Sequence, residues 1–264
     1  MKNSTCLSSL IGMFTLATLA DAQVINEDAK LLASDGAFSD GFSRSIAIGE
    51  GLVVIGSPED DDNGVNSGSA YLFNTTGSQI AKLVSSNGRP FDAFGGAVAI
   101  SDGVIAIGAY YADSVPEILG GGDGAVYLFD SSGVEFAELT PNDPAGFFGR
   151  SIASDNGLIV VGANTDNELG PQSGAAYLFD MQGNEIAKIT AADGAPYDRF
   201  GSDVAIDSEV LVVAAPLDDD NGLDSGAVYL FNPSGVQFTK LTADDGSERD
   251  GFGGQLLLVL ELLQ

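Results

Sequence analysis

The chain has 264 residues, 38 of them acidic and 10 basic, so its formal net charge is −28; it has no histidine and no tryptophan. A protein surface with this net negative charge repels phosphate backbones and anionic lipids, which argues against nucleic-acid binding and membrane-surface binding. Its apolar fraction of 44% is sufficient for a buried core, so the chain is not a disordered acidic tail.

The first 22 residues have the order of a secretory signal. Lys2 precedes an apolar stretch from Leu7 to Leu19, and Ala20-Asp21-Ala22 follows it as a small-residue cleavage site. We expect cleavage after Ala22, which leaves residues 23–264 as a secreted or cell-surface protein. Its only cysteine, Cys6, lies within the signal, so we expect no disulfide in the mature chain. No later segment has the length of apolar sequence that a membrane helix needs, so we expect no membrane insertion.

Two short markers recur along the rest of the chain in step with each other. The triplet Tyr-Leu-Phe occurs at 71–73, 127–129, 177–179 and 229–231, and a Phe followed by Ser or Gly occurs at 42, 94, 148, 200 and 252. Self-similarity at a fixed period is the signature of a repeat architecture. The units are 42–93, 94–147, 148–199 and 200–251, with a partial unit at 252–264.

Each unit contains four short β-rich runs, which in the first unit are 45–48, 52–55, 69–73 and 79–84. Asp102-Gly103 and Asn156-Gly157 separate the first two runs in later units, as hairpin turns do. The run 158–161 is apolar on both faces, which suits a sheet packed between two other sheets. The pattern predicts an all-β fold, a β-propeller of four-stranded antiparallel blades with four complete blades and an incomplete fifth. The charged residues Lys82, Glu138, Lys188 and Lys240 are interpreted as guards on an outer edge strand.

An antiparallel meander places the second-to-third strand loops and the links between units at one rim. Most of the acidic residues of the mature chain fall in these two kinds of connection. The sequence therefore predicts an acidic loop face rather than an evenly distributed negative charge.

Two nearly identical loops, 58–68 and 216–226, are the best candidates for a metal site. Oxygen ligands select hard cations, and outside the cell that means calcium. Three consecutive carboxylates repel one another, and a divalent ion would relieve that repulsion. An alignment with the EF-hand fails, and one alternative stays open: Asp, Asn and Gly are good turn formers in a solvated loop. The candidate ligands are Asp60, Asp61, Asp62, Asn63, Asn66, Asp218, Asp219, Asp220, Asn221 and Asp224.

The combination of Phe-Gly, an apolar second strand and Tyr-Leu-Phe resembles the FG-GAP repeat family, found in integrin alpha subunits and in many bacterial secreted proteins. The resemblance covers nearly all of the mature chain and implies an extracellular propeller. Family members that bind calcium usually carry an Asp-rich loop between the first two strands, and here that link is a short hairpin. The family's calcium site therefore does not transfer to this chain.

Family propellers generally have seven blades, and the last residues of this chain do not complete a fifth. Residues 255–264 are apolar, with no turn and no Tyr-Leu-Phe. We favour a truncated or frame-shifted reading frame. The alternative is that these residues form inner strands of a fifth blade, with residues 24–34 as its outer closing strand.

The composition also limits the catalytic and metal-binding chemistry of the chain. Without histidine, a serine nucleophile lacks its usual base, and zinc and copper lack their preferred ligands. We expect a non-catalytic module that binds an extracellular protein or polysaccharide through its acidic loop face, with calcium as a candidate bridge. The alternatives are a propeller-fold glycan hydrolase or lyase, and a structural fragment of a longer surface protein.

Overall fold

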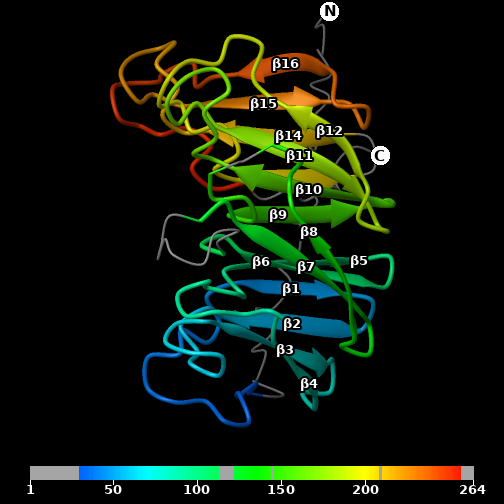
Figure 1. Cartoon of the computed structure of the whole chain (residues 1–264). Helices are drawn as coiled ribbons and strands as arrows, with labels where there is room; N and C mark the ends of the chain where they lie inside the picture. The colour runs from blue at the N-terminus through cyan, green and yellow to red at the C-terminus, as the bar shows by residue number, and fades with distance from the viewer. Residues whose placement is uncertain (1–29, 113–121, 144–145, 208–209, 257–264) are drawn as a thin grey trace, which may run out of the picture. The chain divides into compact units, whose positions relative to one another are not determined.

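Among the residues that the structure describes, sixteen short strands form four sheets of four strands each (Figure 1). The computed structural model describes residues 30–112, 122–143, 146–207 and 210–256, and all the strands lie in one unit, residues 31–264. The first sheet contains β1 (Ile46–Gly49), β2 (Leu52–Ser57), β3 (Ser69–Asn74) and β4 (Gln79–Leu83); the second contains β5 (Ala97–Ser101), β6 (Val104–Ala109), β7 (Ala125–Asp130) and β8 (Glu135–Leu139). The third contains β9 (Ser151–Asp155), β10 (Leu158–Ala163), β11 (Ala175–Asp180) and β12 (Glu185–Ile189); the fourth contains β13 (Val204–Asp207), β14 (Val210–Ala215), β15 (Ala227–Phe231) and β16 (Gln237–Leu241).

Every sheet is an antiparallel meander in which sequential strands are neighbours. Where the first hairpin turn is described it carries two residues with positive φ, as in Asp102-Gly103 and Asn156-Gly157, the conformation that a two-residue hairpin requires. The four sheets confirm the predicted β-propeller blades. The predicted strands agree with β1 to β4 to within two residues at each end.

The core lies between consecutive sheets, because both faces of the two middle strands are apolar. In the Tyr-Leu-Phe triplet of β7, Tyr127 and Phe129 pack against the first sheet and Leu128 packs against the third. The marker Phe148 inserts edge-on between Tyr177 and Phe179. Its ring centroid is 5.5 Å from that of Tyr177 and 5.7 Å from that of Phe179. The marker phenylalanines at 94, 148 and 200 and the triplets, apart from the half-buried Leu230, are thus core residues. Phe252 of the partial unit remains 36% exposed.

The first sheet has a different neighbour on its outer face. Leu31, Ala33 and Phe42 pack against Tyr71 and Phe73. Residues 31–33 form no strand, so the described part of the expected closing segment covers the sheet with side chains only. The rest of that segment, the signal peptide, and most of residues 255–264 lie outside the described residues.

Side-chain contacts also join each sheet to the link that precedes it. The first residue of the outer strand accepts a hydrogen bond from a backbone N–H in that link, at 2.9–3.1 Å. The acceptors are Gln79, Glu135, Glu185 and Gln237, and the donors are Ser34, Ser86, Asn142 and Ala192. Neighbouring repeats are therefore joined by polar bonds at the outer edge as well as by the core.

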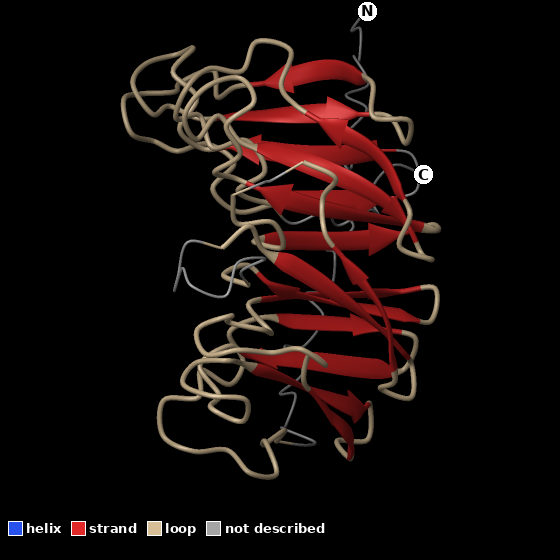
Figure 2. Ribbon diagram, viewed as in Figure 1, coloured by secondary structure: helices blue, strands red, loops and turns tan. Residues whose placement is uncertain are grey.

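The connections divide between two edges of the sheets, as Figure 2 shows. Short hairpins lie along one edge, and the second-to-third strand loops lie with the inter-sheet links along the other. We call the latter the loop edge. Each link docks on the loop of the sheet before it: the N–H groups of Tyr197, Arg199 and Phe200 donate to the carbonyls of Pro171, Gln172 and Ser173. The loop edge is thus a braced surface, and it carries the candidate site.

Candidate functional site

Three of the loops at the loop edge, in the first, third and fourth sheets, share one hydrogen-bonded frame. In the first, the N–H of Gly68 donates to the carbonyl of Asp60, and the N–H of Asn66 donates to the carboxylate of Asp61. The third and fourth sheets repeat both bonds, with Asp166 and Asn167, and with Asp218 and Asp219. Because the frame uses carboxylates and amides as acceptors for backbone N–H groups, it explains part of the Asp and Asn content of these loops.

A lysine ammonium lies at the centre of each of these three loops. In the third sheet, Lys188 Nζ is 3.0 Å from Asp166 Oδ2 and 2.8 Å from Glu168 Oε2, and the Tyr177 hydroxyl donates to Asp166 at 3.1 Å. We call such a group a lysine cluster. The other two contain Asp60, Asp62, Tyr71 and Lys82, and Asp218, Asp220, Tyr229 and Lys240.

Two of the clusters recruit a further carboxylate from the preceding link. Lys82 Nζ is 2.7 Å from Asp35, and Lys240 Nζ is 2.9 Å from Asp193. Burial would lower the pKa of Lys82, but its hydrogen bonds to Asp35 and Asp62 raise the pKa above the ordinary lysine value. In return, the Lys82 ammonium lowers the pKa of Asp35. Each lysine is therefore charged and fixed, with its ammonium about 5 Å from the centre of a tyrosine ring.

The predicted metal ligands come together within each loop, but around an ammonium ion. Asp60 and Asp62 contact Lys82, and Asp218 and Asp220 contact Lys240. The remaining candidates serve the loop frame: Asp61 and Asp219 accept backbone N–H groups, the N–H groups of Asn63 and Asn221 donate to serine hydroxyls, and Asn66 and Asp224 adopt positive φ. Among the described residues, no group of three or more Asp, Glu, His or Cys has a metal-binding arrangement. Calcium binding at these loops stays a prediction.

The structure corrects the interpretation of the lysines as edge guards. Lys82, Lys188 and Lys240 point into the loops, and their side chains are only 17% exposed. Each lysine is the cross-strand partner of the triplet tyrosine of its sheet, as Lys188 is of Tyr177. The lysine and the tyrosine side chains therefore lie on the same side of the sheet. The third loop was missed as a site, although a signal exists: in all three sheets the tyrosine is 11 residues and the lysine 22 residues after the buried aspartate.

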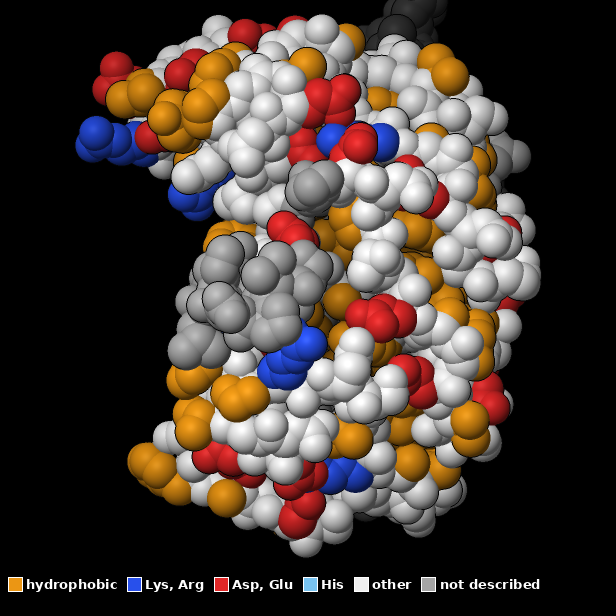
Figure 3. Space-filling model, in the orientation of Figure 1, with side chains coloured by type: hydrophobic (Ala, Val, Ile, Leu, Met, Phe, Trp, Pro, Cys, Tyr) orange, Lys and Arg blue, Asp and Glu red, His pale blue; other side chains and the backbone are white. Residues whose placement is uncertain are grey.

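The pairing of basic side chains with carboxylates affects the distribution of charge on the loop edge. On the face drawn in Figure 3, several blue basic side chains lie directly against red carboxylates. The acidic residues therefore do not form an unbroken negative patch there.

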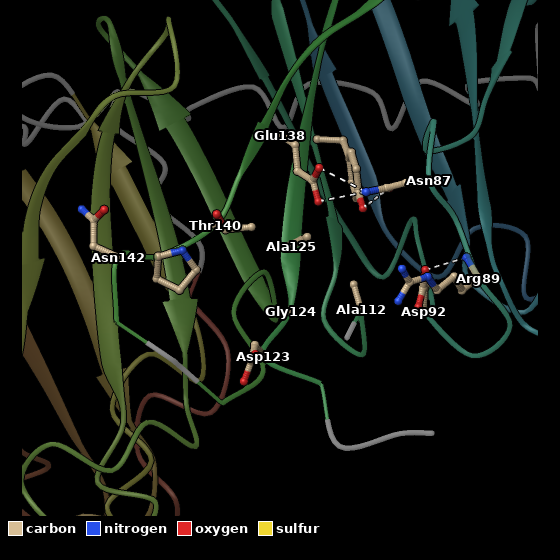
Figure 4. Close-up of a pocket in the computed structure, with 12 residues that line it drawn as sticks. Asn87, Arg89, Asp92, Ala112, Asp123, Gly124, Ala125, Glu138, Thr140 and Asn142 are labelled. Carbon is tan, nitrogen blue, oxygen red and sulfur yellow. Dashed lines mark hydrogen bonds between the residues drawn. The ribbon is translucent and has the colours of Figure 1, made fainter. Parts of the chain in front are cut away.

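In the second sheet, the described residues form no lysine cluster. Ala112 replaces the buried aspartate and Glu138 replaces the lysine, and a cavity of about 310 Å³ lies beside them. Figure 4 shows Glu138 facing Asn87, whose amide donates to the carboxylate at 3.2 Å while its carbonyl accepts the Tyr127 hydroxyl at 2.7 Å. Loss of the cation and loss of its buried partner occur together, because either charge alone would remain buried and unpaired.

Two further adjoining cavities, of about 430 and 710 Å³, lie at the loop edge. The smaller is lined by Arg44, Tyr110, Tyr111, Phe147, Asn164, Thr165, Gln172, Arg150 and Arg199. The larger shares Arg44, Tyr110 and Tyr111 and adds Pro58, Glu59, Asn66, Phe91 and Ala93. We call the smaller one the arginine–aromatic cavity. No motif in the sequence pointed to it, since its residues come from separate repeats.

One carboxyl at this edge has a strongly altered acidity. Burial raises the pKa of Asp198 to about 6, despite a hydrogen bond from the N–H of Ala195. A raised pKa is typical of catalytic acids. Asp198, however, lines none of the three cavities above, and Asp92 makes the same bond to the N–H of Arg89 in another link. The raised pKa of Asp198 therefore follows from its structural position in the link.

Comparison with known proteins gives one family. The model described as FG-GAP repeat matches residues 25–73, 78–129, 134–179 and 184–231. Among solved structures, the chain is similar to the computationally designed Ika4 protein, with 15% identity, a TM-score of 0.49, and coverage of 78% of this chain and 98% of that one. No curated protein matches the chain. Within the described residues, no helix is long and apolar enough to cross a membrane.

Proposed function

Since the chain belongs to the FG-GAP repeat family, we propose that it is a non-catalytic, secreted or cell-surface module that binds an extracellular protein or polysaccharide through its loop edge. FG-GAP repeats form propeller-type binding and adhesion modules, which supports the general class. The signal-like first 22 residues support secretion.

The observation that carries this proposal is the contrast between the two edges of the sheets. Three cavities open among the long loops, whereas the opposite edge is made of short hairpins. Concave sites on loops braced by a rigid scaffold are where proteins place recognition. Most carboxylates of the loops serve as acceptors for lysines or backbone N–H groups, which favours binding over acid–base catalysis.

The proposal is tested by blocking one edge at a time. Val65, at a loop tip, is 54% exposed, and Val134, in a hairpin of the opposite edge, is 59% exposed. Val65→Cys and Val134→Cys, each with Cys6→Ser, give two matched proteins with a single thiol for a polyethylene glycol maleimide. We expect the modified Val65→Cys protein to lose binding to glycan arrays and extracellular-matrix proteins, and the modified Val134→Cys protein to keep it.

Equal binding by both modified proteins would contradict the proposal, as would no ligand for the unmodified protein. The same glycans serve to test the alternative of a hydrolase or lyase. Release of reducing ends or unsaturated products that is lost in Glu138→Gln would favour that enzyme.

Calcium is a separate element of the proposal, and the lysine clusters allow a sharp test of it. An ammonium ion already occupies the space between Asp60 and Asp62 and between Asp218 and Asp220, so calcium has to displace it. We expect calorimetric heat and a raised Tm with the wild-type protein, and neither with all four residues changed to Asn. Lys82→Gln with Lys240→Gln should bind calcium more tightly than the wild type. No heat with either the wild type or the lysine variant would remove calcium from the proposal.

A further inference from the structure

The arginine–aromatic cavity is built from residues that the repeat does not require. Arg44 and Arg150 stand two positions after the marker Phe, where other repeats have Gly96, Ser202 and Gly254. Arg199 and Phe147 stand directly before the marker, where others have Gly41, Ala93 and Gly251. Tyr110-Tyr111 corresponds to Pro58-Glu59, Asn164-Thr165 and Pro216-Leu217. Six residues at four repeat positions, where most other repeats carry different residues, thus converge on one cavity, and packing of the scaffold does not explain this.

The backbone at two of these positions supports the same conclusion. Arg199 and Phe147 have φ of +57° and +58°, whereas two of the equivalent positions carry glycine. Side chains other than glycine adopt this left-handed conformation at a cost. A large side chain kept at such a position points to a role for the side chain itself.

The three arginines of this cavity differ from the lysines of the clusters in having no acidic partner among the described residues. Residues 23–264 contain nine Lys and Arg. Three of them are the paired lysines of the clusters, and three are Arg44, Arg150 and Arg199. Within the described residues, no carboxylate is within 4.0 Å of these three guanidinium groups. Arg150 instead stacks 5.1 Å from the centre of the Tyr110 ring, and Arg199 donates to Gln172.

The surroundings of the cavity remain acidic, so the concentration of arginines is confined to the cavity itself. Glu59 lines the adjoining cavity, and Asp203 lies near enough to Arg150 for the guanidinium to act on its pKa. In a chain of net charge −28, three unpaired guanidinium groups therefore form a local positive site inside a negative field.

We propose that the arginine–aromatic cavity binds a uronate residue of an acidic polysaccharide. Guanidinium groups bind carboxylates through paired N–H donors. Tyr110, Tyr111 and Phe147 form an aromatic cluster, with centroids 4.4–6.4 Å apart, against which the C–H face of a sugar ring packs by dispersion. Asn164, Thr165 and Gln172 provide polar side chains for the hydroxyl groups. A volume of about 430 Å³, continued by the adjoining 710 Å³, has the size of small-ligand sites.

This inference rests on the proposed binding function and names its ligand class. Its test is calorimetric titration of the full protein in 0.15 M salt with three probes: an oligogalacturonate, its fully methyl-esterified form and an oligoglutamate peptide. The ester keeps the sugar shape and removes the charge, and the peptide keeps carboxylates without the sugar. We expect binding of the oligogalacturonate, at least tenfold weaker binding of the other two, and a similar tenfold loss in Arg150→Gln and Arg44→Gln.

Arg249→Gln is the matched control, because Arg249 is an exposed arginine of the fourth link that lines none of the three cavities of the loop edge. It should bind oligogalacturonate as the wild type does, and all three variants should keep the wild-type Tm. Equal affinity for the ester, tighter binding of the peptide, an equal loss in Arg249→Gln, or no binding of the oligogalacturonate would each overturn the inference. A different ligand, blocked by modification at Val65→Cys, would still leave the proposed function standing.

Discussion

Gly174→Ala should cost more than about 4 kcal/mol of folding free energy or prevent folding, whereas Gly157→Ala should cost only about 1 kcal/mol. Both glycines adopt left-handed backbone, with φ of +83° and +79°, so the conformational penalty is the same. They differ in what surrounds them. A Cβ on Gly174 would lie 2.0 Å from the carbonyl oxygen of Phe200, while a Cβ on Gly157 would meet nothing within 4 Å.

The clash at Gly174 involves backbone that cannot move alone. Gly174 forms an isolated parallel bridge with Phe200, and Phe200 is buried between Tyr229 and Phe231. Shifting this backbone would therefore disturb the core between the third and fourth sheets. Urea unfolding followed by circular dichroism measures both variants. A similar unfolding midpoint for the two would show that the close approach of link and loop does not limit stability.

The second large effect is expected from Lys188→Met, which should lower the free energy of unfolding by about 2–4 kcal/mol. Methionine preserves much of the side-chain volume but leaves the Asp166 carboxylate, only 2% exposed, without its cation. The expected loss is smaller than for a fully buried pair because the Lys188 side chain is 17% exposed. Urea unfolding at pH 7 gives the value.

Two further variants separate pairing from packing in this cluster. Lys30→Met replaces an exposed lysine and should leave the unfolding free energy nearly unchanged. Asp166→Asn combined with Lys188→Met should recover part of the loss, since the buried carboxylate is then absent. A deficit that is the same in the single and double variants would show that the ammonium acts only through packing.

The second sheet is a natural counterpart of these substitutions. There Ala112 and Glu138 replace the buried aspartate and the lysine, and the Tyr127 hydroxyl donates to Asn87. The strands and the core around them are those of the other sheets. A lysine cluster is therefore one of at least two arrangements of side chains beneath the second-to-third strand loop in this fold. The chain tolerates loss of the lysine where the buried aspartate is replaced as well.

The site was less predictable from sequence than the fold. The acidic loops are conspicuous in the sequence because their Asp residues are consecutive, but the sequence does not show that Lys82 and Lys240 pair with them. The pairing depends on the register between Tyr71 and Lys82, and on contacts such as that between Asp35 and Lys82 across 47 residues. No motif in the sequence predicts the arginine–aromatic cavity, because its members range from Arg44 to Arg199.

The sequence by itself determined the strands, the turns and the composition of the core, because these follow from local alternation of apolar residues, from residues such as Gly157 that accept positive φ, and from a repeated Tyr-Leu-Phe. Only the tertiary structure decided which charges meet. Ion pairs and cavities form where side chains from different repeats approach within a few ångströms, and nothing in the local pattern around Arg150 or Lys188 specifies those neighbours.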